Sequence, residues 1–254
     1  MPLTPAHAAL AWPLASIPRL PVAALVIGTL SPDFEYVLRL APRGTFAHSL
    51  LGVGLFCVPA SVLLFVLFER AVGPALLDLL PTGFRVHASR RVPEGSRSHV
   101  RTLAWAVPAA ALGALSHVVW DGFTHETGWV VVRVPVLTES VALLEPLRRI
   151  PIYKLLQHCS TFFGLTALIS WMVLTVSRIP AGSRRFEPKQ RLRFLRSMAI
   201  LLCASAVAGA LNSLRAQDRG LAPMLGFAAV GSMAGLFLGL LAVTAVKRYR
   251  KTET

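Results

Sequence analysis

An apolar segment that begins near Leu103 ends in the sequence Gly113-Ala114-Leu115-Ser116-His117-Val118-Val119-Trp120-Asp121-Gly122-Phe123-Thr124-His125. In a helix, a turn of about 100° per residue places His117, Asp121 and His125 along one face. Ionisable side chains are costly to bury in an apolar helix, and in membrane spans they usually serve a function. The alternative is a hydrogen-bonded ladder that faces other helices and holds them together.

The composition is typical of a membrane protein. Of the 254 residues, 54% are hydrophobic and only 15% are charged, and the mean hydropathy is +0.61. Soluble domains carry about 25% charged residues. The net charge of +14 is typical of cytoplasmic loops beside anionic lipid, so we expect membrane lipids and no nucleic acid as partners. Cys57, Cys159 and Cys203 have no CxxC spacing and are expected to be small buried hydrophobes.

The order of apolar stretches predicts an all-α, polytopic helical membrane protein. About five transmembrane helices are expected, at residues 46–68, 103–123, 160–176, 198–211 and 221–246. The earlier apolar stretch Val22–Leu30 is too short to span a bilayer, which requires about twenty residues. We therefore expect short interfacial or re-entrant helices at the N-terminus, beginning with Thr4 as N-cap and Pro5 at the first helical position. No secretory signal peptide is expected, because the first residues lack a basic region.

The distribution of Lys and Arg predicts how these helices are oriented in the membrane. Of the 26 Lys and Arg residues, 17 lie in 69–101, 178–196 and 247–251, which share one side if there are five spans. The positive-inside rule then places the C-terminus in the cytoplasm and the connection 124–156 outside, in a plasma (inner) membrane. The predicted parts are a His/Asp-containing membrane core (1–177), a basic cytoplasmic loop (178–196) and two C-terminal spans with a basic tail (197–254).

This topology brings six metal-type ligands to one outer interface, provided that Val22–Leu30 does not cross the membrane. They are His7, Asp33, His48, His117, Asp121 and His125. Such a set suits zinc or manganese. Eight residues of helix span about 12 Å, so His117 and His125 can share one ion only if the helix bends at Gly122. Either Asp121 bridges two ions, or one ion is bound and His125 stands outside its ligand shell.

Each of these residues also has a simpler interpretation. Asp33 after Ser31-Pro32 is equally well an N-cap, and His7 or His48 alone is more often an interfacial or core histidine. His158, together with Lys154 at the outer start of the third span, either completes the site, binds an anionic head group, or belongs to an interfacial belt.

Five motifs resemble a family of bacterial integral membrane proteins called domain of unknown function 4184. They are Thr4-Pro5-Ala6-His7, Gly28-Thr29-Leu30-Ser31-Pro32-Asp33-Phe34, Arg43-Gly44-Thr45-Phe46-Ala47-His48-Ser49-Leu50, Ser116-His117-Val118-Val119-Trp120-Asp121-Gly122-Phe123-Thr124-His125 and Pro151-Ile152-Tyr153-Lys154-Leu155-Leu156-Gln157-His158. The resemblance covers roughly the first two-thirds of the chain. More distantly, the order of these motifs is similar to membrane-bound metal-dependent hydrolases and zinc-dependent phospholipase C. It implies a metal site and hydrolysis of a phosphoester.

We therefore expect metal-assisted hydrolysis of a lipid or lipid-linked phosphoester at the outer interface. Asp33 or Glu126 would act as general base. The alternative is a non-enzymatic membrane protein whose His/Asp cluster is structural, binds metal or docks a partner.

Overall fold

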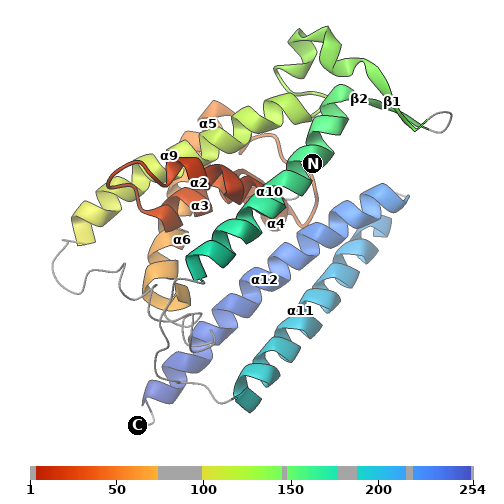
Figure 1. Ribbon diagram of the computed structural model, residues 1–254. Coiled ribbons are helices and arrows are strands. Elements are labelled where there is room, and N and C mark those ends of the chain that lie inside the picture. Colours follow the sequence, from red (N-terminus) through yellow and green to blue (C-terminus); the bar gives the residue numbers. More distant parts are fainter. Residues whose placement is uncertain (1–3, 74–98, 145–147, 177–187, 216–219, 253–254) are drawn as a thin grey trace. The chain divides into compact units, whose positions relative to one another are not determined.

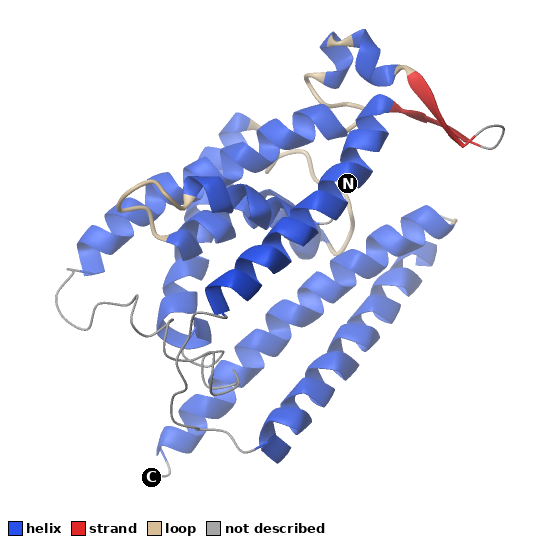
Figure 2. Cartoon of the chain, viewed as in Figure 1, coloured by secondary structure: helices blue, strands red, loops and turns tan. Residues whose placement is uncertain are grey.

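The computed structural model describes residues 4–73, 99–144, 148–176, 188–215 and 220–252. Within these ranges the chain is almost entirely helical, with one small sheet (Figure 2). The prediction of an all-α polytopic fold is confirmed. The chain divides into two compact units, one formed by residues 1–32, 46–65 and 97–175 and the other by residues 33–45, 66–96 and 176–254.

The first unit begins with short helices. One helical stretch runs through α1 (Thr4–His7), the 3-10 helix η1 (Ala8–Leu10) and α2 (Ala11–Leu14). The helix α3 (Val22–Leu30) follows after Pro21, which is extended with φ −66° and ψ 118°. Its bounds are those expected from the sequence. Nine helical residues rise about 14 Å, so α3 alone is too short to cross a bilayer with a hydrocarbon core of about 30 Å.

The helix α9 (His99–Thr124) packs closely against α3 (Figure 1). Glycines on both helices allow this contact. A Cβ atom on Gly28 would lie 2.5 Å from the Ala110 carbonyl oxygen, and one on Gly113 would overlap the Leu25 carbonyl oxygen. Small residues at such a crossing let two backbones approach, which is a common way to pack membrane helices. The backbone of Thr29 is thereby held beside α9.

A third helical run of the first unit begins after Ser49. Its elements are α5 (Leu50–Gly52), the π-helix η3 (Val53–Cys57), α6 (Val58–Leu67) and the π-helix η4 (Phe68–Val72), of which residues beyond 65 belong to the second unit. Ser49 caps α5, because its hydroxyl accepts a hydrogen bond of 3.0 Å from the Gly52 N–H. Cys57 is fully buried with Ala47 and Ala114, as expected for a small hydrophobe, but Cys159 is half-buried and Cys203 is exposed, so the prediction of three buried cysteines is wrong for Cys203. This packing anchors the segment that carries His48.

The connection after α9 contains more regular structure than the sequence predicted. Two 3-10 helices, η6 (Val131–Arg133) and η7 (Pro135–Thr138), precede an antiparallel pair of strands, β1 (Ser140–Leu144) and β2 (Arg148–Pro151). Ser140 pairs with Pro151 and Val141 with Ile150. Strands of four and five residues are too short to give a detectable alternation, so the sequence showed no strand signal. The helix α10 (Ile152–Val176) completes the unit.

The second unit contains α4 (Phe34–Arg39) and two long helices, α11 (Pro188–Arg215) and α12 (Leu221–Thr252). Glycines again allow close contact, because a Cβ atom on Gly209 would overlap the Phe227 carbonyl oxygen. The Asn212 side chain on α11 donates a hydrogen bond of 3.0 Å to the Leu40 carbonyl oxygen just after α4. The unit is therefore a helical hairpin to which α4 is attached.

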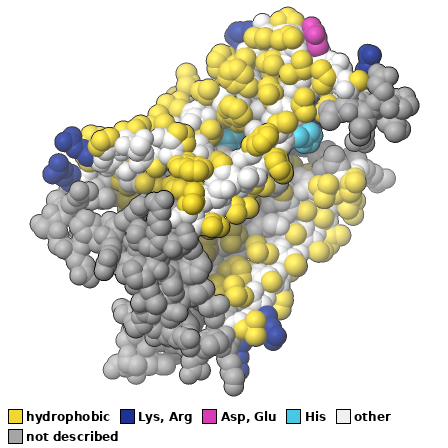
Figure 3. All heavy atoms as spheres, viewed as in Figure 1, with side chains coloured by type: hydrophobic (Ala, Val, Ile, Leu, Met, Phe, Trp, Pro, Cys, Tyr) yellow, Lys and Arg dark blue, Asp and Glu magenta, His cyan; other side chains and the backbone are white. Residues whose placement is uncertain are grey.

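Four helices in the described ranges are long and apolar enough to cross a membrane: Leu50–Val72, Arg101–Thr124, Leu192–Arg215 and Pro223–Ala242. The apolar part of α11 is longer than the expected 198–211. The remaining expected span, 160–176, lies in α10 and is not one of these four. Hydrophobic side chains cover much of the face in Figure 3. These observations indicate a membrane protein.

Candidate metal centre

The centre of the site is Asp121 near the end of α9. Asp121 is only 7% exposed. His117, one turn earlier on the same face, is 0% exposed. The predicted pairing along the helix is present, with His117 Nε2 lying 3.3 Å from Asp121 Oδ2. Burial of a carboxylate requires compensating partners.

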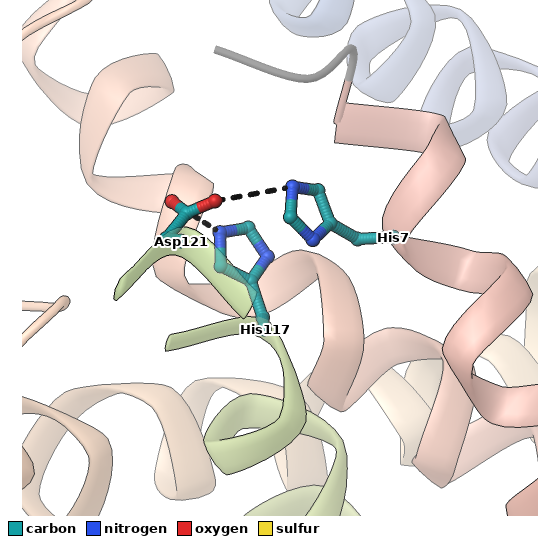
Figure 4. A group of neighbouring side chains, drawn as sticks. All are labelled: His7, His117 and Asp121. Atoms are coloured by element: carbon teal, nitrogen blue, oxygen red, sulfur yellow. Dashed lines mark ion pairs between the residues drawn. The ribbon is translucent and has the colours of Figure 1, made fainter. Parts of the chain in front are cut away.

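Four imidazoles supply these partners in the described part of the chain. The Oδ2 atom of Asp121 faces His117 and also His48, whose Nε2 lies 3.5 Å away. The Oδ1 atom faces His7 Nε2 and His125 Nδ1, each at 3.5 Å. Figure 4 shows His7 of α1 pointing toward Asp121 from the side opposite the backbone of α9. The tertiary structure thus gathers four predicted histidines around one carboxylate.

These distances suit ligands that share a cation. Direct hydrogen bonds between a charged donor and a carboxylate are about 2.7–2.9 Å long. Two atoms bound at about 2.0–2.1 Å to a tetrahedral zinc ion lie about 3.4 Å apart. The distances from His7, His48 and His117 to Asp121, which are 3.3–3.5 Å, match the second arrangement. His7, His117 and Asp121 each offer a ligand atom, and these atoms lie within 4.8 Å of one another.

The orientation of His117 is fixed by the backbone of α3. Its Nδ1 lies 2.7 Å from the Thr29 carbonyl oxygen. A carbonyl oxygen only accepts hydrogen bonds, so this contact places the proton on Nδ1 and leaves the Nε2 lone pair directed toward Asp121. Thr29 was not recognised from the sequence. A main-chain carbonyl leaves no signal in the residue type, and its position depends on the α3–α9 contact.

His7 and His48 approach the same imidazole from two directions. The His7 ring stacks on His117 with centroids 3.7 Å apart and an interplanar angle of 15°. The His48 ring meets it edge-on, at 5.3 Å and 67°. His7 is 3% exposed, whereas the His48 side chain is half-buried. The three rings therefore form one compact group beside the carboxylate.

His125 stands at the edge of this group. α9 ends at Thr124, and the His125 N–H still donates to the Asp121 main-chain oxygen at 3.1 Å. Its Nδ1 also lies 3.2 Å from that oxygen. Burial lowers the pKa of the His125 imidazole, although the Asp121 charge opposes this effect. A neutral ring that donates to the Asp121 backbone would orient the carboxylate from outside the ligand set.

The other predicted residues are Asp33, Glu126, His158 and Lys154. Asp33 is fully buried and immediately precedes α4 in the second unit, where its side chain makes no N-cap hydrogen bond to that helix. Its role as ligand or base stays a prediction. Glu126 is exposed in the turn after α9, and burial together with the Glu126 charge raises the pKa of the Tyr153 phenol on α10. His158 is exposed on α10, and Lys154 is half-buried one turn before it.

Comparison with known protein families gives a match over almost the whole chain. The sequence model of the family Domain of unknown function (DUF4184) matches residues 1–245. The similarity therefore extends through α11 and most of α12, beyond the two-thirds of the chain indicated by its motifs. No curated protein and no solved structure matches the chain. The chain belongs to the DUF4184 family.

Proposed function

We propose that this member of the DUF4184 family is a membrane-bound metal-dependent hydrolase that acts on a lipid or lipid-linked phosphoester at the outer membrane interface. The observation that carries the proposal is the Asp121 carboxylate, which is buried and faces four imidazoles at 3.3–3.5 Å. Buried ionisable groups in a membrane protein are costly and usually functional.

One zinc or manganese ion is the proposed cofactor. His7, His117 and Asp121 would bind it, and His48 would complete a His/carboxylate set that both metals accept. The contact of His125 with the Asp121 backbone supports an orienting role outside this set. Asp33 remains a candidate further ligand. A second ion bridged by Asp121 is the alternative, and metal stoichiometry decides between them.

Hydrolysis needs an activated water and a base. A divalent ion lowers the pKa of a bound water toward neutrality and polarises a phosphoryl oxygen. Asp33 or Glu126 would accept the proton from that water. Glu126 is exposed directly after His125, so solvent can carry the proton away from it.

The position of the cluster supports a lipid substrate. Asp121 and His125 lie at one end of the candidate span Arg101–Thr124, at the depth where head groups begin. If α10 also crosses the membrane, residues 69–101, 178–196 and the C-terminal tail share one side, and their excess of Lys and Arg then supports a cytoplasmic C-terminus and a site on the extracytoplasmic side of the plasma membrane.

The test combines metal analysis with an activity assay on detergent-purified protein. The wild type should contain about one zinc or manganese per chain, and hydrolysis of a phosphatidylglycerol substrate should stop with a chelator and return with added metal. The double variant His117→Ala/Asp121→Ala should lose both metal and activity. Val119→Ala changes an exposed side chain on the same helix and should keep both. Full metal content in the double variant would refute the proposal.

The second candidate is a structural cluster without catalysis. The bond from His117 Nδ1 to the Thr29 carbonyl oxygen ties α9 to α3, as polar groups between membrane helices do. A stable wild-type protein without metal would favour this function. Metal without turnover would favour metal binding or transport.

A further inference from the structure

An apolar cavity adjoins the metal centre within the first unit. Its volume is about 200 Å³, and His7 forms part of its wall. The same His7 ring places Nε2 3.5 Å from Asp121 Oδ1. The His7 side chain is therefore part of both the candidate metal centre and the wall of the cavity.

The lining of the cavity is mostly apolar. Three segments contribute to them: the helical stretch 6–13, α9 through Trp120, and α10 through Ser160, Phe163 and Gly164. The described lining residues include no Lys or Arg that could bind a phosphate. The one hydroxyl, Ser160 Oγ, already donates 3.0 Å to the Gln157 carbonyl oxygen. An acyl segment in the cavity would therefore lie mainly against apolar side chains.

The cavity opens on an exposed apolar face formed by Phe163 of α10 and Trp120 of α9. Phe163 is 65% exposed and Trp120 is 37% exposed. Phe162, Ile169, Met172 and Val173 are also exposed on α10, but at about 100° per residue they lie on other faces of that helix than Ser160, Phe163 and Gly164. In a membrane protein such a face lies against lipid tails. A chain from a neighbouring lipid can therefore enter the cavity without crossing a polar barrier.

We infer that this cavity receives one acyl chain of a phospholipid and holds its ester or phosphate group at the His7–His117–Asp121 centre. That the bound lipid is a substrate rests on the proposed function. The volume equals that of roughly six or seven water molecules, at about 30 Å³ each. It accommodates a short length of one chain near the head group.

Photo-crosslinking in membranes tests the inference without requiring turnover. The full chain is reconstituted in phosphatidylglycerol vesicles that contain a phosphatidylglycerol with a diazirine near the carboxyl end of one acyl chain. After irradiation, adducts are mapped by mass spectrometry. We expect them to concentrate on Leu10, Trp120 and Phe163, above the level on the exposed Ile169 of α10. Equal labelling of Ile169, or none in the cavity, would overturn the inference.

Two substitutions fill the cavity from opposite walls, namely Ser160→Phe on α10 and Ala9→Phe on η1. Each should lower the adducts on Trp120 by roughly tenfold, a typical effect of altered shape in an apolar pocket. The matched control is Thr166→Phe, because Thr166 is exposed on α10 outside the lining and its hydroxyl also bonds to a preceding carbonyl, that of Phe162. An unchanged helical circular-dichroism spectrum and melting temperature show that a filled variant is folded. A folded, filled variant with undiminished Trp120 labelling would refute the inference.

The outcomes separate the two proposals. Cavity labelling without any hydrolysis leaves the lipid site standing and removes the proposed activity. If the protein hydrolyses the lipid but is labelled equally on all exposed apolar residues, the cavity inference is refuted and the proposed function is retained.

Discussion

The α3–α9 pair of the first unit and the α11–α12 pair of the second are packed in the same way but contain different chemistry. Both pairs approach through glycines whose missing Cβ atoms would overlap the partner's backbone, as at Gly113 and Gly231. Neither α11 nor α12 contains a His, Asp or Glu residue. α9 instead buries His117 and Asp121. Close packing through glycines is thus common to both pairs, whereas among the described residues of these four helices only α9 has buried ionisable side chains.

Removal of the central carboxylate should have the largest effect. Asp121→Asn retains the shape but not the charge that faces four imidazoles. We expect complete loss of metal and activity, and a loss of unfolding free energy of about 3–5 kcal/mol, the usual result of breaking a buried ionic group. Metal analysis and thermal unfolding measure these changes. If the variant has the wild-type melting temperature and metal content, the α3–α9 pair does not differ in this way from the α11–α12 pair.

Leucine at the two glycine contacts should separate packing from chemistry. Gly113→Leu and Gly231→Leu should each destabilise the protein by about 1–3 kcal/mol, because overpacking displaces a backbone. Only Gly113→Leu should also lose metal, since it displaces Thr29, which orients His117.

The control for this pair is Gly54→Ala, because no atom lies within 4 Å of its added Cβ. Its unfolding free energy should rise by at most about 1 kcal/mol, because alanine is favoured over glycine within a helix. Loss of metal in Gly231→Leu would show that the metal site depends on the α11–α12 pair.

His125→Ala should have an intermediate effect. Its ring contacts the Asp121 backbone from the edge of the cluster, and loss of such an outer partner typically weakens metal binding by about 10–100-fold. His117→Ala should abolish binding under the same conditions. Competitive titration with a fluorescent chelator measures both affinities. Equal losses would make His125 a direct ligand and favour two ions.

The smallest effect is expected at the surface of the second unit. Arg39 Nη2 lies 2.7 Å from Glu35 Oε1, and the Arg39 side chain is 58% exposed. The Glu35 side chain is only 9% exposed, so this half-exposed pair should contribute about 1 kcal/mol, the upper end of the range for surface pairs. Arg39→Met should therefore lower the melting temperature by about 2–4 °C and leave the metal content unchanged. Loss of metal in this variant would contradict this interpretation.

Much of the architecture could be predicted because its signals are local. Pro21 before Val22 and Ser31-Pro32 after Leu30 delimit α3, and the observed helix has these bounds. The spacing of His117 and Asp121 predicted one face of α9. Short strands were missed, because β1 and β2 are stabilised by pairing with each other and not by a pattern within either one. The match to the family likewise covers more of the chain than the motifs do, because the later helices are apolar and contain few distinctive residues.

The sequence by itself determined that this is a helical membrane protein and which side chains could bind metal, because hydropathy, helical spacing and ligand chemistry belong to the residues themselves. Only the tertiary structure decided that His7 and His48 meet His117 around Asp121. It also decided that Thr29 orients His117 through a carbonyl and that an apolar cavity begins at His7. These contacts join residues up to 114 positions apart, and they depend on the approach of α3 to α9 at Gly28 and Gly113. A backbone contact of that kind is a property of two packed helices, which neither helix specifies alone.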